Sequence, residues 1–319
     1  MKRWKQRPEG SAWGDYGADD TLGRLRELTP ERVVRAAAEI REGRRFCLSL
    51  PLDYPGGNTL HPNRFPPIFE AVDRDGTPTI DYPLHIGTPG AQGVVNDDVV
   101  RIWTQYSTQW DGLAHIGTTF DANGDGAAET VYFNGHYPGP DVANMAEFGV
   151  QGRGVMVDLF RRYGLEHTAV TYAMLSEVMR EQHVSVEAGD ILTLHTGMGQ
   201  AILDAKKAPS ADIKNNCAAL DGRDTELHAW IRDTKIAAIV SDNFAVEVHP
   251  ARPSNTPAHG LPLHELCLFK LGVNLGEIWY LTELAAWLGA NSRNRFFLTA
   301  APLRLPGSPG SPVTPIATV

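Results

Sequence analysis

Cysteine is scarce in this sequence, and long apolar runs are missing. The 319 residues include three cysteines, at positions 47, 217 and 267, and none of them forms a C-x-x-C pair. An odd, widely spaced set excludes a disulfide framework and predicts free thiols in a reducing compartment. No stretch reaches the roughly 18 apolar residues of a transmembrane span, and the polar N-terminus does not resemble a signal peptide. We therefore expect a cytoplasmic protein.

Positive charge is also in short supply. The formal net charge is −9 at pH 7, which argues against nucleic acid or an anionic membrane as the main partner. A G-x-S-x-G motif is missing, and Cys217 and Cys267 have no activating sequence context, so we do not expect a covalent nucleophile. A small-molecule substrate remains the expectation.

The patterning of the chain predicts one α/β protein. A helix is expected from Pro30 to about Glu42, with Thr29 as its N-cap and Gly43 just past its end. A second helix is expected from Tyr172 to Gln182, with Thr171 as its cap. Both segments carry the signals that begin a helix, so their starting residues are the firmest part of this prediction.

Two apolar segments, Ile191–Leu194 and Ile236–Val240, are typical of strands that are covered on both faces. A helix near Asp224–Arg232 precedes the second of them. Arg45–Leu52 alternates loosely as a strand, and the Pro- and Gly-rich Pro51–Pro67 is expected to form a long loop. The extended first hundred residues also predict added antiparallel structure.

The run from Gln105 to His115 has a high density of ligand-type side chains. On a strand, residues 105, 107, 109 and 111 would point the same way, because side chains alternate between faces. Gln105, Gln109 and Asp111 would then share one side. His115 lies four residues beyond Asp111 and reaches that side only if the chain turns at Gly112.

This run resembles the signature H-x-G-T-H-x-D-x-x-x-H of the cyclase and kynurenine formamidase-like family of metal-dependent hydrolases. Its conserved positions are filled here by Gln105, Thr108, Gln109, Asp111 and His115. Two family imidazoles are therefore carboxamides. A competing register begins at His115 and puts Thr119 and Asp125 at the later His positions. We prefer the first register, because its Asp and its final His are both intact.

The resemblance extends over nearly the whole chain. It includes Gly17–Gly23, Gly189–Gly197, Ser241–Glu247 and the tail Leu303–Val313, which it predicts to be ordered. It implies a single α/β domain over residues 1–319 with the family's swivelling β/β/α fold, in which helices flank a mixed sheet. An extended N-terminal segment, about residues 1–70, is expected to pack on this domain or on a partner subunit.

A metal site is also implied by the resemblance. The expected ligands are Gln109, Asp111, His264 and Glu277, and the expected catalytic residues are His115, Asp111 and Glu277, with His115 as acid and base. The expected substrate contacts are Trp110, Gln105 and His195. One divalent ion, Mn or Zn, is expected without an organic cofactor, since imidazole and carboxylate suit these metals and Gln is a weaker donor than His.

The implied activity is metal-dependent hydrolysis of an amide, cyclic amide or imide, or lactone bond in a small aromatic or cyclic substrate. An arylformamidase or cyclic amidase, acting on carbon–nitrogen bonds other than peptide bonds, is the leading expectation. The alternatives are a polyketide-type cyclase or lactonase of the same family, or a binding protein that has lost its metal. The family resemblance further implies a homodimer or homotetramer.

Overall fold

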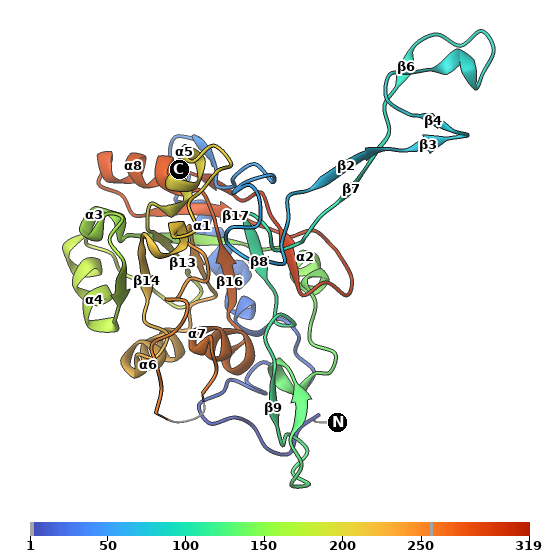
Figure 1. The fold of residues 1–319 in the computed structure, drawn as a ribbon. Helices are drawn as coiled ribbons and strands as arrows, with labels where there is room; N and C mark the ends of the chain where they lie inside the picture. The colour runs from blue at the N-terminus through green and yellow to red at the C-terminus, as the bar shows by residue number, and fades with distance from the viewer. Residues whose placement is uncertain (1–2, 256–257) are drawn as a thin grey trace.

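The structure, a computed structural model, describes residues 3–255 and 258–319 and is built around a mixed sheet of nine strands (Figure 1). Strands β11, β13, β15 and β16 run parallel at its centre, and the outer strands pair antiparallel. In spatial order the strands are β1 (Arg45–Cys47), β19 (Ile316–Thr318), β17 (Arg295–Thr299), β11 (Gln151–Asp158), β13 (Ile191–His195), β15 (Ala238–Ser241), β16 (Asn274–Glu277), β8 (Gln109–Asp111) and β18 (Gly310–Pro312).

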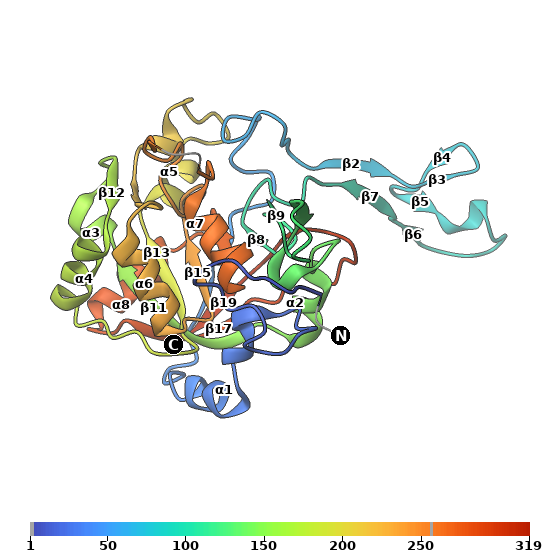
Figure 2. The same ribbon diagram turned by 90° about the horizontal axis from the view of Figure 1, so that it is seen from below.

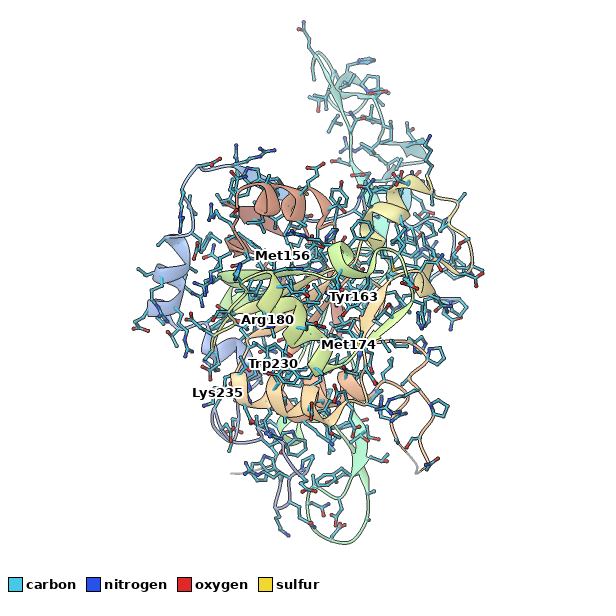
Figure 3. All side chains as sticks on the ribbon, turned by 90° about the vertical axis from the view of Figure 1, so that its left-hand side faces the viewer. Met156, Tyr163, Met174, Arg180, Trp230 and Lys235 are labelled. Atoms are coloured by element: carbon cyan, nitrogen blue, oxygen red, sulfur yellow. The ribbon has the colours of Figure 1, made fainter. Side chains whose placement is uncertain are left out.

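Helices cover both faces of this sheet, so its central strands are apolar on both sides, as the sequence predicted. Ile191 packs into one core and its neighbour Leu192 into the other. Figure 3 looks onto one covering layer, with Met174 on α4 and Trp230 on α6 among its labelled side chains. The helices are α1 (Pro30–Ala37), α2 (Val142–Phe148), α3 (Phe160–Tyr163), α4 (Tyr172–Glu181), α5 (Met198–Asp204), α6 (Thr225–Thr234), α7 (Pro262–His264), the π-helix η5 (Glu265–Leu271) and α8 (Thr282–Ala290).

These elements confirm the predicted α/β class with a mixed sheet. None of the helices in the described ranges has the length and apolar character needed to cross a membrane. The tail predicted to be ordered is ordered, because residues 310–312 form the edge strand β18 beside β8. The described residues also form short 3₁₀ helices: η1 (Gly23–Glu27), η2 (Leu84–Ile86), η3 (Phe133–Gly135) and η4 (Ile213–Asn215).

Helix α1 is shorter than the sequence predicted. It begins as expected, with the Thr29 hydroxyl accepting a hydrogen bond from Arg32 N, but it ends at Ala37 and not near Glu42. The amides of Glu42 and Gly43 instead donate to the carbonyl of Val319, at 3.0 and 2.8 Å. The amides in between donate to carbonyls three residues earlier, so the α-helical pattern stops at Ala37. The C-terminal residue then holds the amides of Glu42 and Gly43.

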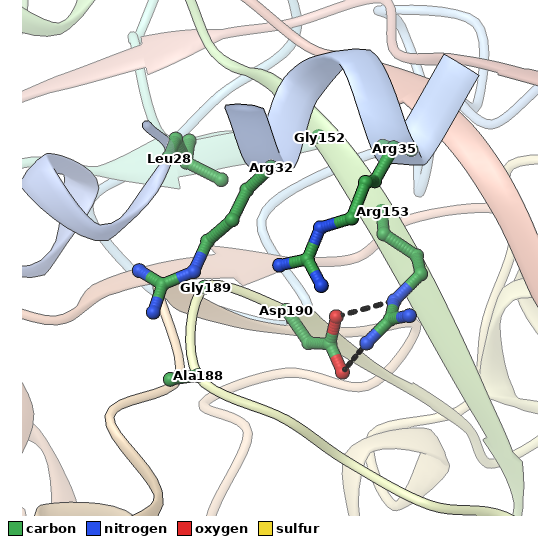
Figure 4. Close-up of a pocket in the computed structure, with 9 residues that line it drawn as sticks. Leu28, Arg32, Arg35, Gly152, Arg153, Ala188, Gly189 and Asp190 are labelled. Atoms are coloured by element: carbon green, nitrogen blue, oxygen red, sulfur yellow. Dashed lines mark hydrogen bonds and ion pairs between the residues drawn. The ribbon is translucent and has the colours of Figure 1, made fainter. Parts of the chain in front are cut away.

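Figure 4 shows where α1 lies against the sheet. Arg153 on β11 donates two hydrogen bonds to the carboxylate of Asp190, at 2.7 and 3.0 Å, and Arg32 and Arg35 of α1 flank this pair. The hollow between them encloses about 20 Å³, which is room for about one water molecule. This arginine-rich contact between α1 and the sheet therefore has a structural role and is not a substrate pocket.

A long ribbon projects from the body of the molecule, as Figures 1 and 2 show from two directions. We call residues 68–101 the arm. It is made of three two-stranded pairs: β2 (Ile68–Ala71) with β7 (Asp98–Arg101), β3 (Asp73–Arg74) with β4 (Thr77–Pro78), and β5 (Tyr82–Pro83) with β6 (Val94–Val95). This confirms added antiparallel structure in the first hundred residues. Smaller pairs are β9 (Thr118–Phe120) with β10 (Glu129–Val131), and β12 (Thr168–Val170) with β14 (Ala218–Leu220).

The N-terminal segment crosses the end of the π-helix η5 at two glycines. Gly23 has φ +56°, and a Cβ placed on it would lie 2.3 Å from the carbonyl oxygen of Gly272. The next amide, Arg24 N, donates to that oxygen at 2.7 Å. Only glycine fits here, because the backbones touch and the conformation is left-handed. The crossing holds η5, which joins His264 to β16.

Replacing Gly23 by Ala should therefore destabilise the protein by about 2–4 kcal/mol, through strain at positive φ and a clash with backbone. Chemical denaturation would measure this free energy of unfolding. Gly43→Ala is the matched control, because Gly43 has φ +69° and open space around it, so it should cost only about 1 kcal/mol. Equal losses in the two variants would contradict the crossing.

Candidate functional site

Strands β8 and β16 bring the first polar side chains together. In their antiparallel register Gln109 lies opposite Glu277. Gln109 Nε2 donates to Asp111 Oδ1 at 3.1 Å and to Glu277 Oε2 at 3.4 Å, and all three residues are buried. Trp110 points to the opposite face and packs against Trp279, with ring centroids 5.2 Å apart. The structure thus places Trp110 in the core and not beside the other predicted site residues.

His264 lies at the end of α7, and carboxylates contact both of its ring nitrogens. Nδ1 lies 2.8 Å from Glu247 Oε1, and Nε2 lies 3.1 Å from Glu277 Oε1. Burial alone would lower the pKa of this imidazole, but the two hydrogen bonds and the two negative charges outweigh it and raise the pKa to about 10. The ring is thus fixed in orientation from both sides.

The backbone beside each of these carboxylates adopts a left-handed conformation. Ala245 and Val246, just before Glu247, have φ +79° and +57°, and Ile278, just after Glu277, has φ +56°. Positive φ is costly for any side chain and especially for a β-branched one, and such strain persists where the surroundings enforce it. Two strained turns therefore aim two carboxylates at one imidazole.

The rest of the run from Gln105 to His115 enters the site from a turn and not from a strand. Only residues 109–111 are extended, so the alternation expected from residue 105 onward is wrong, and Ser107 bonds to backbone away from the site. Gln105 Nε2 nevertheless contacts Asp111 Oδ1 and lies 3.0 Å from His115 Nδ1. The turn at Gly112 exists, because His115 N donates to the Gly112 carbonyl at 2.9 Å.

Asp111, His115 and His264 form a cluster that could hold a metal ion. Each offers one ligand atom, and these atoms all lie within 4.8 Å of one another. Asp111 Oδ2 is buried and has no hydrogen-bond partner, and the same is true of Gln109 Oε1. A buried acceptor without a donor is costly, and a cation would satisfy it. Two imidazoles and a carboxylate suit zinc or manganese, so the residues present fit such an ion.

Basic and aromatic residues lie around a small hollow beside Gln105 and near His115, and we call them the mouth: His61, Arg64, Lys214, Phe244 and His249. Burial lowers the pKa of His61, and the charges of Arg64, His249, Lys214 and His115 lower it further. Phe244 packs against His249, with ring centroids 6.2 Å apart. A lowered pKa favours neutral His61, so Arg64 and Lys214 supply the positive charge of this mouth, and Phe244 and His249 supply its ring surfaces.

His195, a predicted substrate contact, lies at the end of β13 in a different set of contacts. Its Nδ1 lies 2.8 Å from Asp158 Oδ1, its Nε2 lies 3.4 Å from the Thr282 hydroxyl and 4.0 Å from Asp242 Oδ2, and its ring packs against Phe160. These partners are not members of the cluster. The structure brings together Gln105, Gln109, Asp111, His115, His264 and Glu277, but it does not bring Trp110 or His195 to them.

Glu247 is a site residue to which sequence reasoning assigned no role. Its carboxylate accepts from Leu263 N at 3.0 Å and His264 N at 2.9 Å, besides contacting the imidazole. Only its place in the segment Ser241–Glu247 that resembles the family could have pointed to it.

Within the described residues, the competing register of the motif does not lead to a second cluster. Asp121 and Asp125, which it would use, accept hydrogen bonds from backbone amides of their own turn between β9 and β10. Thr119 is exposed. These contacts explain why a run of this composition occurs there, and they favour the first register.

Fold and site together define an α/β protein with a candidate metal centre between β8, β16 and α7. A family described as "Putative cyclase" matches residues 47–248. The solved structure of a novel cyclase is 30% identical, with a TM-score of 0.76, and covers 97% of each chain. The chain therefore belongs to the cyclase family, as its motif predicted.

More distant solved structures share the fold. Isatin hydrolase A from Ralstonia solanacearum is 18% identical, with a TM-score of 0.59, and covers 91% of this chain and 97% of its own. Isatin hydrolase A from Labrenzia aggregata, bound to benzyl benzoate, is 15% identical, with a TM-score of 0.58, and covers 86% and 93%. No curated protein matches the chain. These likenesses confirm the predicted cyclase-like fold.

The contacts of His195 predict a pH-dependent contribution to stability. Burial lowers its pKa, but the hydrogen bond with Asp158 and the charges of Asp242 and Asp158 raise it above the usual 6.5. A raised folded-state pKa means that the contribution is complete below pH 6.5 and is lost as pH rises through the folded value. The melting temperature lost in His195→Gln should therefore be larger at about pH 6 than at about pH 9.

The matched control is His167→Gln, which removes an exposed imidazole and should show no such trend. Thermal unfolding of the three proteins across this range would measure the effect. A loss for His195→Gln that grows toward alkaline pH would contradict the assignment.

Proposed function

We propose that this protein is a metal-dependent hydrolase that cleaves an amide, cyclic amide or imide, or lactone bond of a small aromatic or cyclic substrate. The observation that carries the proposal is the cluster of Asp111, His115 and His264, in which the buried Asp111 Oδ2 has no hydrogen-bond partner. Such an acceptor beside two imidazoles is expected where a divalent cation binds.

One ion fits the cluster better than two. The carboxamides of Gln105 and Gln109 both donate to Asp111 Oδ1, so only Oδ2 remains free on that carboxylate. Nδ1 of His264 is held by Glu247, which leaves Nε2 as its ligand atom. Asp111 Oδ2, His264 Nε2 and His115 would together hold zinc or manganese.

Such an ion supplies Lewis acidity, which lowers the pKa of water and polarises a carbonyl group. The chain supplies the remaining functions. Glu277 Oε1, 3.1 Å from His264 Nε2, is the carboxylate that would take up a proton from attacking water and return it to the leaving nitrogen or oxygen. Glu247 positions the imidazole, as outer carboxylates of metal-bound histidines do.

His115 has two candidate roles. The sequence resemblance implied an acid and base, whereas its position within the cluster favours a ligand. It is the only one of the three that is not fully buried, so it would lie nearest the substrate in either role. Substitution of His115 separates the two roles, because a variant that lacks a ligand loses the ion as well as activity. A variant that lacks only the acid and base keeps the ion and loses activity.

The mouth supports a small substrate with a ring and a carbonyl group. Phe244 and His249 offer ring surfaces, and Arg64 and Lys214 offer positive charge near His61. The distant structural neighbours are named for hydrolysis of isatin, an aromatic cyclic amide. A polyketide-type cyclase or lactonase remains the alternative activity, and product analysis would distinguish ring closure from ring opening.

A binding protein without a metal is the alternative from another class. The same buried acceptors argue against it, since a site that had lost its ion would be stabilised by a donor to Asp111 Oδ2. The strained backbone at Val246 and Ile278 argues against it as well, because strain is retained where function requires it.

The first test measures metal binding. Wild-type protein incubated with Mn²⁺ or Zn²⁺ and then desalted should retain about one ion per chain. Asp111→Asn should weaken the affinity for the metal ion at least about 100-fold, because it removes the negative charge of the carboxylate whose Oδ2 is free. Elemental analysis and titration calorimetry would measure stoichiometry and affinity.

Asp121→Asn is the control for this test, since the competing register would make Asp121 the ligand. It should bind metal as the wild type does. Absence of bound metal in the wild type, together with an unchanged melting temperature on adding either ion, would favour the binding protein.

The second test measures turnover of formyl anilides, cyclic imides, isatin and aryl lactones. Glu277→Gln should keep the bound ion but lower kcat at least about 100-fold, because the proton acceptor is lost. Glu265→Gln is the matched control, since Glu265 pairs with Lys270 away from the cluster. Activity restricted to charged aliphatic substrates, or an unchanged kcat in Glu277→Gln, would overturn the proposal.

A further inference from the structure

Basic side chains gather at the mouth of the candidate site, although the chain as a whole is acidic. The formal net charge is −9 at pH 7. The four charges with the largest effect on His61 nevertheless all belong to basic residues: Arg64, His249, Lys214 and His115. The hollow beside Gln105 has no carboxylate among the described residues that line it. The charge of the mouth is therefore opposite to that of the chain.

A small buried core fixes the two segments that carry these basic groups. Leu60 and Ile213 pack in the same cluster as Ile278, which directly follows β16. His61 and Lys214 are the next residues along the chain from Leu60 and Ile213. The core therefore brings a side chain of the loop 51–67 and one of η4 to the same end of β16.

Further contacts hold the loop 51–67 in place. The hydroxyl of Tyr106 accepts a hydrogen bond from Gly56 N at 2.9 Å and donates to the carbonyl of Gly57 at 3.0 Å. Asp53 forms an ion pair with Lys207, in the segment that leads to η4. The mouth is thus organised before any ligand binds, which lowers the entropic cost of binding.

The guanidinium of Arg64 uses only part of its hydrogen-bonding capacity. Its Nη1 donates to the carbonyl of Gln105 at 2.8 Å. Among the described residues, none accepts from its Nε or Nη2, and no carboxylate pairs with Arg64 or Lys214. Cations that lie close together repel each other. An anion bound between Arg64 and Lys214 would therefore be stabilised.

The geometry favours a carboxylate as that anion. Nε and Nη2 form one edge of a planar group, which matches the two oxygens of a carboxylate. Arg153 holds the carboxylate of Asp190 by this same edge, at 2.7 and 3.0 Å (Figure 4). The hollow encloses about 10 Å³, which is room for about one water-sized group. A carboxylate oxygen fits such a space better than a phosphate or a sulfate.

His61 adds a neutral donor to this place. Its Nδ1 accepts a hydrogen bond from Asn63 N at 3.2 Å, so the neutral ring carries its proton on Nε2. Burial and the neighbouring positive charges lower the pKa of this imidazole and keep it neutral. The positive charge that attracts an anion therefore comes from Arg64 and Lys214.

Gln105 connects this place with the metal cluster. Its carbonyl accepts from Arg64, whereas its carboxamide contacts Asp111 and lies 3.0 Å from His115 Nδ1. The length of one residue therefore separates a carboxylate at Arg64 from a bond that is cleaved at the cluster. A small molecule with one ring can span this separation, and Phe244 offers a ring surface beside it.

We propose that the substrate carries a carboxylate in addition to the bond that is cleaved, and that Arg64 binds this carboxylate through Nε and Nη2 while Lys214 adds positive charge. The substrate class is then an aromatic or cyclic amide, imide or lactone with one carboxylate group. This proposal rests on the proposed function and makes its substrate more specific. A bound carboxylate would also offset the repulsion between the basic mouth and a metal ion in the cluster.

The first test compares formanilide with the three formamidobenzoates, which differ from it only by a carboxylate on the ring. With Mn²⁺ bound, the wild type should prefer at least one formamidobenzoate by at least about 10-fold in kcat/KM, mainly through a lower KM. Arg64→Gln should abolish this preference. Arg64→Lys should retain part of it, because an ammonium group keeps the charge but lacks the planar edge. A general loss of activity cancels, because the preference is a ratio.

Two further variants complete this test. Lys214→Gln should weaken the preference in the same direction as Arg64→Gln. Arg180→Gln is the matched control, since it removes an exposed arginine of α4 and should keep the wild-type preference. Equal kcat/KM values for formanilide and every formamidobenzoate, or a preference that survives in Arg64→Gln, would overturn the proposal.

Binding of benzoate and its neutral analogue benzamide tests the carboxylate site without turnover. In titration calorimetry, Arg64→Gln should weaken the binding of benzoate at least about 10-fold more than that of benzamide. If this difference is present but no amide is hydrolysed, the proposed hydrolase activity fails and the carboxylate site is supported. Equal effects on the two ligands would overturn the carboxylate site, whatever the turnover.

Discussion

The site depends on one interaction, the imidazole of His264 held between the carboxylates of Glu247 and Glu277. All three groups are buried, and Asp111 places a third buried carboxylate 3.8 Å from the same ring. Burying carboxylates is costly unless positive charge and hydrogen bonds compensate. One imidazole does not balance three carboxylates, so further positive charge at this place would stabilise the buried cluster. A cation bound as proposed above would supply that charge and would also pair with the free oxygen of Asp111.

The carboxamides of Gln105 and Gln109 determine which oxygen of Asp111 is left free for a cation. Gln105 and Gln109 donate to Asp111 Oδ1, and Gln109 also donates to Glu277. An amide N–H is a neutral donor, so it satisfies a lone pair without supplying charge. With glutamines at positions 105 and 109, Oδ1 of Asp111 is occupied by hydrogen bonds, whereas Oδ2 is left free to bind a ligand. On the proposed function, the cluster would therefore hold one ion and not two.

The sequence predicted the elements whose signals are local. Thr171 begins α4, Asp224 begins α6, and apolar runs became β13 and β15. It failed where tertiary contacts decide: after α1 the chain tightens into three-residue turns, and the amides of Glu42 and Gly43 donate to Val319 and not to a helix. The site residues likewise divide into those that local sequence predicts and those that tertiary structure brings in. Asp111 and His115 belong to a contiguous motif, whereas Glu247 has a role only because two left-handed residues before it turn the chain toward His264.

The arm has a physical connection with the site. It leaves the body after His61 and Arg64 and returns just before Gln105, and the rings of Phe65 and Trp103 close its base at 5.3 Å. Arg64 also donates to the carbonyl of Gln105 at 2.8 Å. The base of the arm therefore restricts both Arg64 of the mouth and Gln105, whose carboxamide contacts Asp111. Because Gln105 enters the site from a turn and not from a strand, these contacts at the base of the arm fix its position from outside the sheet.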